Sequence, residues 1–359
     1  MIPIELKPLK NEILTSWLIR NAIANGIDPI GFTNSIWFDY RAWTRDIARH
    51  LPKDKIHILA KEVSLSFNEL FDLTLESVLA PLSTKTGLNP KKSWEWVIPV
   101  GIRNRSRTNG LYFCPECLQE KPIFLRNHWR LSWNFACHKH RCVLQLNCPQ
   151  CHTVFSAHLA SYTNTDITLC QHCSFDLKKS SFHPSDRLAS ELQEFMNSAL
   201  ENQSFPHNNF PHIDSSVKDF FVTIRILIIF FRTLPRHKKT QYVLLRALGL
   251  THLNPCYSPA KGNTIDSVSA NERHYLFVIT SRLFTLTLKE VIILFRKSGV
   301  TKEMISVRGI VPSQTITHIS SRLSSKTRDN FTPARQEQSV QAKDKQTVEL
   351  LMSDIRTYL

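Results

Sequence analysis

Hydrophobic residues recur at helical spacing through residues 1–90, separated by short polar turns. The stretch NEILTSWLIRNAIANG brings one apolar face together, made of Ile13, Leu14, Trp17, Leu18 and Ala22. Gly26 follows at the position of a helix C-terminal stop. Asp28 and Pro29 then predict the start of another helix, because an aspartate N-cap followed by proline is typical of a first helical turn.

Residues 53–80, KDKIHILAKEVSLSFNELFDLTLESVLA, contain two helical periods joined by a tight turn. Ser66 and Glu69 have the spacing of a capping box that opens the second helix. Two short helices with such a turn are compatible with a helix-turn-helix. The pattern favours an ordinary helical hairpin somewhat more, because base contacts cannot be read from periodicity.

Helical periodicity returns over residues 185–300 and ends near Gly299. The most apolar stretch, FFVTIRILIIFF from Phe220 to Phe231, is too short to span a bilayer and contains Arg225. We therefore predict a buried core helix there and no membrane segment. The N-terminal MIPIELKPLK has no long apolar run, which predicts a cytoplasmic protein.

The remaining segments differ in composition. Residues 91–110 form a basic, loop-rich connector, and the cysteine pairs lie between 111 and 180. From 312 the chain turns to Ser, Thr, Gln and Arg, which predicts a basic polar tail closed by a short terminal helix. We expect a mainly α protein. Its domains would be an N-terminal helical, helix-turn-helix-like domain (1–110), a tandem zinc-finger module with short β-strands (111–180), a C-terminal helical domain (181–311) and the tail (312–359).

Cysteine spacing carries the strongest chemical signal in the sequence. Cys114-x2-Cys117 is followed by Cys137-x2-His140, and Cys148-x2-Cys151 is followed by Cys170-x2-Cys173. Two intervening residues let one turn aim both ligands at one ion, and about 20 residues separate the turns of each set, as in zinc ribbons. We predict two zinc ions per chain. A four-cysteine set also permits an iron–sulfur cluster, but the spacing and the neighbouring histidine-containing set favour zinc.

Both predicted sites are structural, because catalytic zinc keeps an open position for water and these sets supply four protein ligands each. Four further groups lie near the ligands in sequence, namely His128, His138, His152 and Cys142. We expect His138 and His152 to be exposed turn residues and Cys142 to be a small buried side chain. The metal ions would stabilise a module whose core is thin.

Between the two turns of the first set lies NHWRLSWNF, in which Trp129, Leu131, Trp133 and Phe135 alternate with polar residues. Period two predicts a strand with one aromatic face. Packing over the metal module is the favoured role of that face, and stacking on bases or a partner is the alternative. Arg130, on the polar side, is a candidate nucleic-acid or partner contact.

The formal net charge of +15 predicts an anionic partner such as nucleic acid. Residues 91–141 hold ten Lys and Arg against three Glu. Arg103, Arg105 and Arg107 alternate there, and they fit phosphate contacts and a solvated loop equally well. The sequence contains no P-loop, no GxGxxG and no prominent carboxylate cluster, so we predict that the protein is not an enzyme.

The segment YFCPECLQE…HWRLSWNFACHKHRCVLQLNCPQC resembles the zinc module of the TniQ/TnsD family of transposition target selectors. The resemblance rests on a CPxCL turn, a Trp-Arg-hydrophobic-x-Trp segment, a CxxH turn and a CPxC turn, here Cys114–Leu118, Trp129–Trp133, Cys137–His140 and Cys148–Cys151. The early ILTSWLIRNAIANGI also resembles the family's opening helix, and the likeness covers roughly residues 8–180. Arg141 departs from the family, in which glycine commonly follows the histidine.

The resemblance implies a helix-turn-helix region, tandem zinc fingers and a helical C-terminal part in a protein that is not itself a transposase. Family members carry target-site information to a TnsC-like AAA+ ATPase. With 359 residues the chain is closer to the shorter members, which in CRISPR-associated transposons form head-to-tail dimers on the RNA-guided Cascade complex. We therefore expect a non-enzymatic adaptor between Cascade and the ATPase, with DNA or RNA backbone contacts. A TnsD-like, sequence-specific DNA-binding selector is the alternative.

Overall fold

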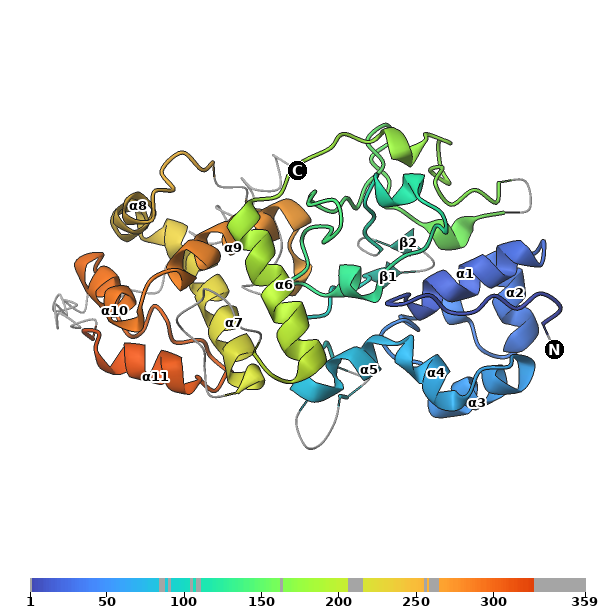
Figure 1. Cartoon of the computed structure of the whole chain (residues 1–359), viewed down its shortest axis with the longest axis horizontal. Coiled ribbons are helices and arrows are strands. Elements are labelled where there is room, and N and C mark those ends of the chain that lie inside the picture. Colours follow the sequence, from blue (N-terminus) through green and yellow to red (C-terminus); the bar gives the residue numbers. More distant parts are fainter. Residues whose placement is uncertain are drawn as a thin grey trace, which may run out of the picture. The chain divides into compact units, whose positions relative to one another are not determined.

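The computed structural model describes residues 2–83, 88–89, 92–103, 106–107, 111–161, 164–205, 216–254, 257 and 265–325. Residues 1–324 form one compact unit. Its described part is mainly helical (Figure 1), as predicted, and contains α1 (Leu14–Ala24), α2 (Pro29–Ile36), α3 (Lys53–Glu62), α4 (Phe67–Asp72), α5 (Leu75–Leu79), α6 (Arg187–Asn202), α7 (Val217–Thr233), α8 (Lys238–Ala247), α9 (Ala270–Phe284), α10 (Leu288–Lys297) and α11 (Gln314–Ser321). The strands β1 (Ile102–Arg103) and β2 (Ser106–Arg107) pair antiparallel.

The N-terminal helices begin where the local sequence signals predict. The Asp28 side chain accepts hydrogen bonds from the backbone N–H groups of Ile30 and Gly31, and Pro29 is the first residue of α2. Ser66 and Glu69 form both halves of the capping box that opens α4. These caps satisfy backbone donors that a helix cannot satisfy internally, so the boundaries follow from short sequence motifs.

Helices α3 and α4 are joined by residues 63–66, the turn at which a helix-turn-helix was considered. Helix α4 is only six residues long, and its exposed residues are Asn68, Glu69 and Asp72. Two carboxylates on the exposed side of the second helix would repel phosphates. This pair therefore fits the ordinary helical hairpin better than a DNA-reading motif.

In the C-terminal half, α6, α7 and α9 pack against one another. Helix α7 is almost wholly buried, as predicted for this apolar stretch, and its Arg225 pairs with Asp266 at 2.6 Å. None of the described helices is long and apolar enough to cross a membrane. A partly buried salt bridge therefore accommodates the one charged residue of the apolar stretch.

Helix α11 corrects the predicted start of the tail. Ser313 caps this helix through the Ile316 N–H, and Ile316, Ile319 and Leu323 are buried. The Ser313 hydroxyl also lies 2.5 Å from the Thr223 hydroxyl of α7. The sequence did not predict this helix because the three buried apolar residues, although at helical spacing, lie in a segment of polar composition. The predicted terminal helix lies outside the described residues.

The aromatic segment after the first cysteine pair is not the predicted strand. Residues Asn127–Arg130 form a 3-10 helix, and Leu131 makes an isolated antiparallel bridge with Val97. Trp129, Leu131, Trp133 and Phe135 are all buried, which confirms the packing role. The polar residues between them are buried as well, so the chain is enclosed on all sides and not on one aromatic face.

This enclosure joins the segments that the sequence divided into domains. On one side Ile13 N donates to Leu125 O at 3.1 Å, and on the other Ile98 N donates to Arg130 O at 2.9 Å. From α6, the Gln193 side chain accepts from the backbone N–H of Phe135 at 2.9 Å. Buried hydrogen bonds thus join the cysteine-rich segment to the N-terminal helices and to α6.

Candidate metal centre

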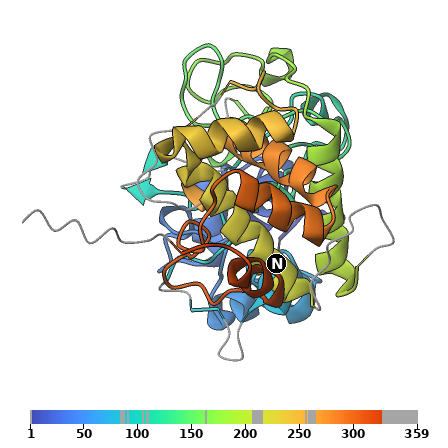
Figure 2. The same ribbon diagram turned by 90° about the vertical axis from the view of Figure 1, so that its left-hand side faces the viewer.

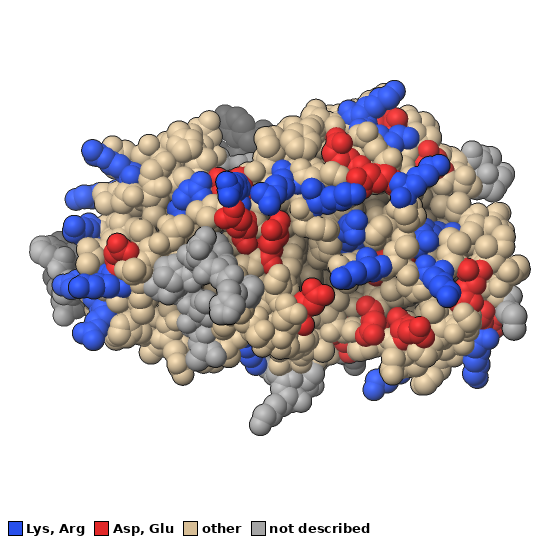
Figure 3. Space-filling view, viewed as in Figure 1, with Lys and Arg blue, Asp and Glu red and all other residues tan. Residues whose placement is uncertain are grey.

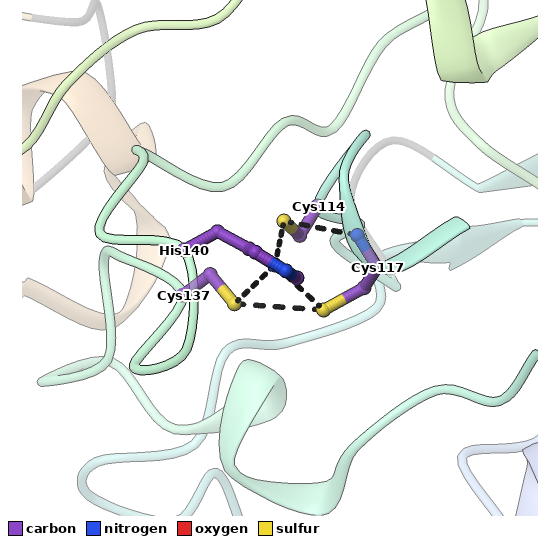
Figure 4. A group of neighbouring side chains, drawn as sticks. All are labelled: Cys114, Cys117, Cys137 and His140. Carbon is purple, nitrogen blue, oxygen red and sulfur yellow. Dashed lines mark hydrogen bonds between the residues drawn. The ribbon is translucent and has the colours of Figure 1, made fainter. Parts of the chain in front are cut away.

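The structure gathers the first predicted ligand set at one point. The ligand atoms of Cys114, Cys117, Cys137 and His140 all lie within 4.8 Å of one another, and Figure 4 shows them converging from two turns of the chain. The Sγ atoms of Cys117 and Cys137 are 3.6 Å apart, and His140 Nδ1 lies 3.3 Å from Cys117 Sγ. Sulfurs bound tetrahedrally to zinc at about 2.3 Å stand roughly 3.8 Å apart, so the geometry fits a zinc ion.

The charges of this set call for a cation. Hydrogen bonds from Cys114 and Cys117 lower the pKa of the Cys137 thiol, whereas the neighbouring Cys114 and Cys137 thiols raise the pKa of Cys117. Three thiolates at this separation repel one another unless a cation lies between them. A divalent soft metal would allow all three cysteines to bind as thiolates.

His140 is oriented by a residue that the sequence analysis missed. Its Nε2 lies 3.1 Å from Glu120 Oε1, and the other oxygen of Glu120 accepts from Lys139 Nζ at 2.6 Å. The lysine hydrogen bond helps to lower the pKa of the Glu120 carboxyl. With Nε2–H donated to a carboxylate, His140 presents Nδ1 to the sulfurs, the usual arrangement of a metal-ligating histidine. The sequence signal, an acid three residues after Cys117, is weak.

The second predicted set also comes together. Cys148, Cys151, Cys170 and Cys173 have their Sγ atoms within 4.8 Å of one another. Cys148 and Cys173 are 3.6 Å apart, as are Cys151 and Cys170. Cys151 and Cys173 are half-buried, so this set lies closer to the surface than the first. Four sulfurs at these separations suit the same tetrahedral metal chemistry.

Three of the four ligand turns share one backbone design. The residue after the second ligand has a left-handed conformation in each, namely Arg141 (φ 48°), His152 (φ 58°) and Ser174 (φ 59°). Its N–H donates to the carbonyl of the first ligand, at 2.8, 2.9 and 2.8 Å respectively. Glycine adopts this conformation without a Cβ penalty, which explains why it commonly fills the position where this chain has Arg141.

The other predicted groups are placed as follows. His138 and His152 are exposed, and Cys142 is buried with its sulfur 3.4 Å from Cys114 Sγ, all as expected. Arg103 and Arg107 lie in β1 and β2, and Arg105 falls outside the described residues.

Arg130 has a structural environment. It is 2% exposed and makes two hydrogen bonds to the Asp46 carboxylate, at 3.1 and 2.7 Å. It also donates to Ile98 O at 2.8 Å. A guanidinium held in this way has its charge neutralised inside the protein, which argues against the predicted contact with nucleic acid or a partner.

Residues 3–144 match the family model described as TniQ. This part of the chain is similar to the TniQ family. The matched region ends just after the first ligand set, and it includes the N-terminal helices that are hydrogen-bonded to that set's aromatic segment. The second ligand set, Cys148 to Cys173, lies beyond it. No curated protein sequence matches the chain.

The match over residues 3–144 supports a role in transposition, as an adaptor or as a target selector. The two ligand clusters give it two places that could hold metal ions. Each cluster supplies four ligands of the kinds that structural zinc uses, and the first is built into the TniQ region itself.

Proposed function

We propose that this chain is a non-enzymatic TniQ-type adaptor that links an RNA-guided Cascade complex to a TnsC-like AAA+ ATPase and so selects the site of DNA insertion. The observation that carries the proposal is the TniQ match over residues 3–144, with the first ligand set folded into it. The protein would act in the cytoplasm as a head-to-tail homodimer.

Two zinc ions would serve this role by fixing the shape of the protein. The first set holds together a chain segment that contacts the N-terminal helices on one side and α6 on the other. Four protein ligands satisfy a tetrahedral ion, so its task in the proposal is to position surrounding surfaces. Arg103, Arg105 and Arg107 remain proposed contacts to nucleic acid or protein from the connector.

Co-purification tests the adaptor proposal directly. Zinc-loaded, tagged protein would be mixed with assembled Cascade carrying its guide RNA, and separately with the ATPase in the presence of nucleotide. Retention of both partners is the expected result, with Cascade assembled without guide RNA as the control. If neither partner is retained at low salt, the adaptor function is wrong.

The second candidate function is a TnsD-like selector that reads a specific DNA site, and the net charge of +15 favours it. Such a protein would bind one duplex far more tightly than unrelated duplexes. Binding to a library of genomic fragments measures this ratio. Equal affinity for all fragments would leave the adaptor as the better description.

A further inference from the structure

Helices α8 and α10 expose two basic stripes of the same design. Lys238, Tyr242 and Arg246 lie at positions i, i+4 and i+8 of α8, and all three are exposed. This spacing aligns them along about 12 Å of one helix side. Lys239 and Arg236 add two more exposed cations near the start of α8. The opposite side of the helix buries Leu244 and Leu245.

Helix α10 repeats the arrangement. Lys289, Ile293 and Lys297 occupy i, i+4 and i+8 and are exposed, and Arg296 lies beside the last of them. Val291 and Phe295 are buried on the other side. Each helix therefore presents cations at both ends of its exposed face and one large apolar or aromatic side chain between them.

The two helices lie next to each other. They are in contact, and Thr240 Oγ1 of α8 is 3.9 Å from the position that a Cβ on Gly299, just after α10, would occupy. Both helices lie at the left edge of Figure 1, the side that Figure 2 turns toward the viewer. Figure 3 shows Lys and Arg gathered along the same edge. We call this surface the α8/α10 patch.

Folding accounts for only part of the charge of this patch. Arg246, Arg296 and Lys297 lie in last helical turns, where the helix dipole favours cations, but the other lysines do not. Lys238 and Lys239 occupy the first turn of α8, where the helix dipole favours acidic residues, and the N-cap His237 makes no side-chain cap. Within the described part of the chain, no ion pair is made by the six cations that lie on α8 and α10 themselves, namely Lys238, Lys239, Arg246, Lys289, Arg296 and Lys297. The one acid on the exposed part of α10, Glu290, is engaged in the capping box with Thr287.

We propose that the α8/α10 patch binds the phosphate backbone of a nucleic acid, independently of base sequence. We choose a nucleic-acid backbone as the ligand because two adjacent rows of unpaired cations are complementary to a ligand with regularly repeated negative charge. Tyr242, 58% exposed between Lys238 and Arg246, can pack against a sugar or an unpaired base. Lys and Arg on these stripes make phosphate contacts, so the patch adds affinity without selecting a site.

This inference goes beyond the adaptor role, since it concerns the C-terminal helices outside the TniQ match. It also differs from the selector role, which requires one preferred duplex. Nucleic-acid binding through this patch would hold a target-selection protein near the insertion site whichever complex delivered it there. Failure of the Cascade test would leave this proposal standing, and failure of the present test would leave the adaptor proposal standing.

The test is fluorescence anisotropy of the zinc-loaded full chain with a labelled 30-base-pair duplex of arbitrary sequence, between 50 and 200 mM salt. The patch variant is Lys238→Glu/Lys239→Glu/Lys289→Glu. All three substitutions fall in first helical turns, where glutamate favours the helix, so lost binding would not come from helix unfolding. The matched control is Lys53→Glu/Lys61→Glu/Lys179→Glu, which changes the net charge equally at exposed lysines elsewhere.

The loss of three phosphate contacts should make the negative slope of log K against log salt shallower by about 2.7, at roughly 0.9 per contact. It should also weaken binding at 50 mM salt by at least about tenfold. The control should stay within about threefold of the unmodified protein, the residual effect of net charge. An RNA of the same sequence, run in parallel, decides whether DNA or RNA is the preferred source of phosphates.

Three results would overturn the proposal. One is an unchanged salt slope in the patch variant, and another is equal loss in patch and control variants. The third is a patch variant that keeps nucleic-acid affinity while losing binding to the ATPase or to anionic vesicles, which would assign the patch to an acidic protein or a membrane surface.

Discussion

Arg225 of α7 and Asp266 form an ion pair at the junction of three parts of the chain. Asp266 Oδ2 accepts from Arg225 at 2.6 Å, and Oδ1 accepts from Ser132 Oγ at 2.6 Å and from the Trp96 backbone N–H at 3.0 Å. One carboxylate thus connects the connector, the aromatic segment of the first ligand set and a core helix. The Arg225 guanidinium also lies 5.1 Å from the ring centroid of Trp96.

Removing this carboxylate should be costly. We expect Asp266→Ala to lower the free energy of unfolding by about 3–5 kcal/mol, because it leaves the buried Arg225 charge with only the exposed Glu95, at 3.9 Å, as an ion-pair partner. Asp266→Asn should cost less, since an amide oxygen can still accept from Ser132 and Trp96. Denaturant unfolding measures both. As a control, Glu191→Ala removes the exposed pair with Arg187 and should leave the free energy of unfolding nearly unchanged. Similar losses at Asp266 and Glu191 would contradict this role.

The metal content should follow the two ligand sets independently. The unmodified protein should contain two zinc ions per chain, and Cys137→Ser and Cys148→Ser should each contain one and be less stable. Cys142→Ala is the control, because this thiol lies 3.4 Å from Cys114 but outside the ligand set, and it should retain both ions. Elemental analysis after gel filtration gives the stoichiometry. A Cys137→Ser protein with two zinc ions would show that the first set is assigned wrongly.

Spacing alone picked out the eight side chains that the structure gathers into two four-residue clusters, because each pair is local in sequence and a CxxC or CxxH turn has few backbone solutions. The prediction that Arg130 contacts nucleic acid or a partner failed because its interactions are not local in sequence. Its partner Asp46 lies 84 residues away, and no periodicity reveals such a pair. Helix α11 was missed because its cap, Ser313, and its buried Ile316 sit in a segment of polar composition. The paired stripes on α8 and α10 became visible only once the fold showed which sides face outward.

The hydrogen bond between Glu120 and His140 should raise the affinity of the first site for zinc without changing the number of zinc ions bound. We expect Glu120→Gln to weaken zinc binding at the first site by about 10–100-fold, because the amide polarises the imidazole less than the carboxylate does. Competition with a chromophoric chelator measures this change. Glu116→Gln, in the same turn and without a hydrogen bond to His140, is the matched control. Equal zinc affinities in both variants would show that Glu120 does not contribute to metal binding through His140.

The left-handed backbone at Arg141 predicts an order of stability. Arg141→Gly should raise the free energy of unfolding by about 0.5–1 kcal/mol, because glycine tolerates φ 48° and arginine is strained there. Arg141→Val should lower it by at least as much, since a β-branched residue suits this conformation least. Lys179→Gly, at an exposed residue without positive φ, should destabilise. If glycine destabilises at both positions, the turn is not strained by Arg141.

His128 predicts a loss of stability in mild acid. Burial, with a smaller contribution from His138, lowers the pKa of His128 to about 3 in the folded protein, and its Nε2 is buried without a hydrogen-bond partner. In the unfolded chain the pKa is about 6.5, so the unfolded state gains a proton first as the pH falls. His128 should therefore reduce the free energy of unfolding by about 1.3 kcal/mol between pH 7 and pH 5.5. Denaturant unfolding at both pH values, with zinc retention verified, measures this loss. The loss of about 1.3 kcal/mol should be absent from His128→Phe and present in the exposed-site variant His318→Phe. An equal pH dependence in the His128→Phe protein and the unmodified protein would assign the acid sensitivity to other groups.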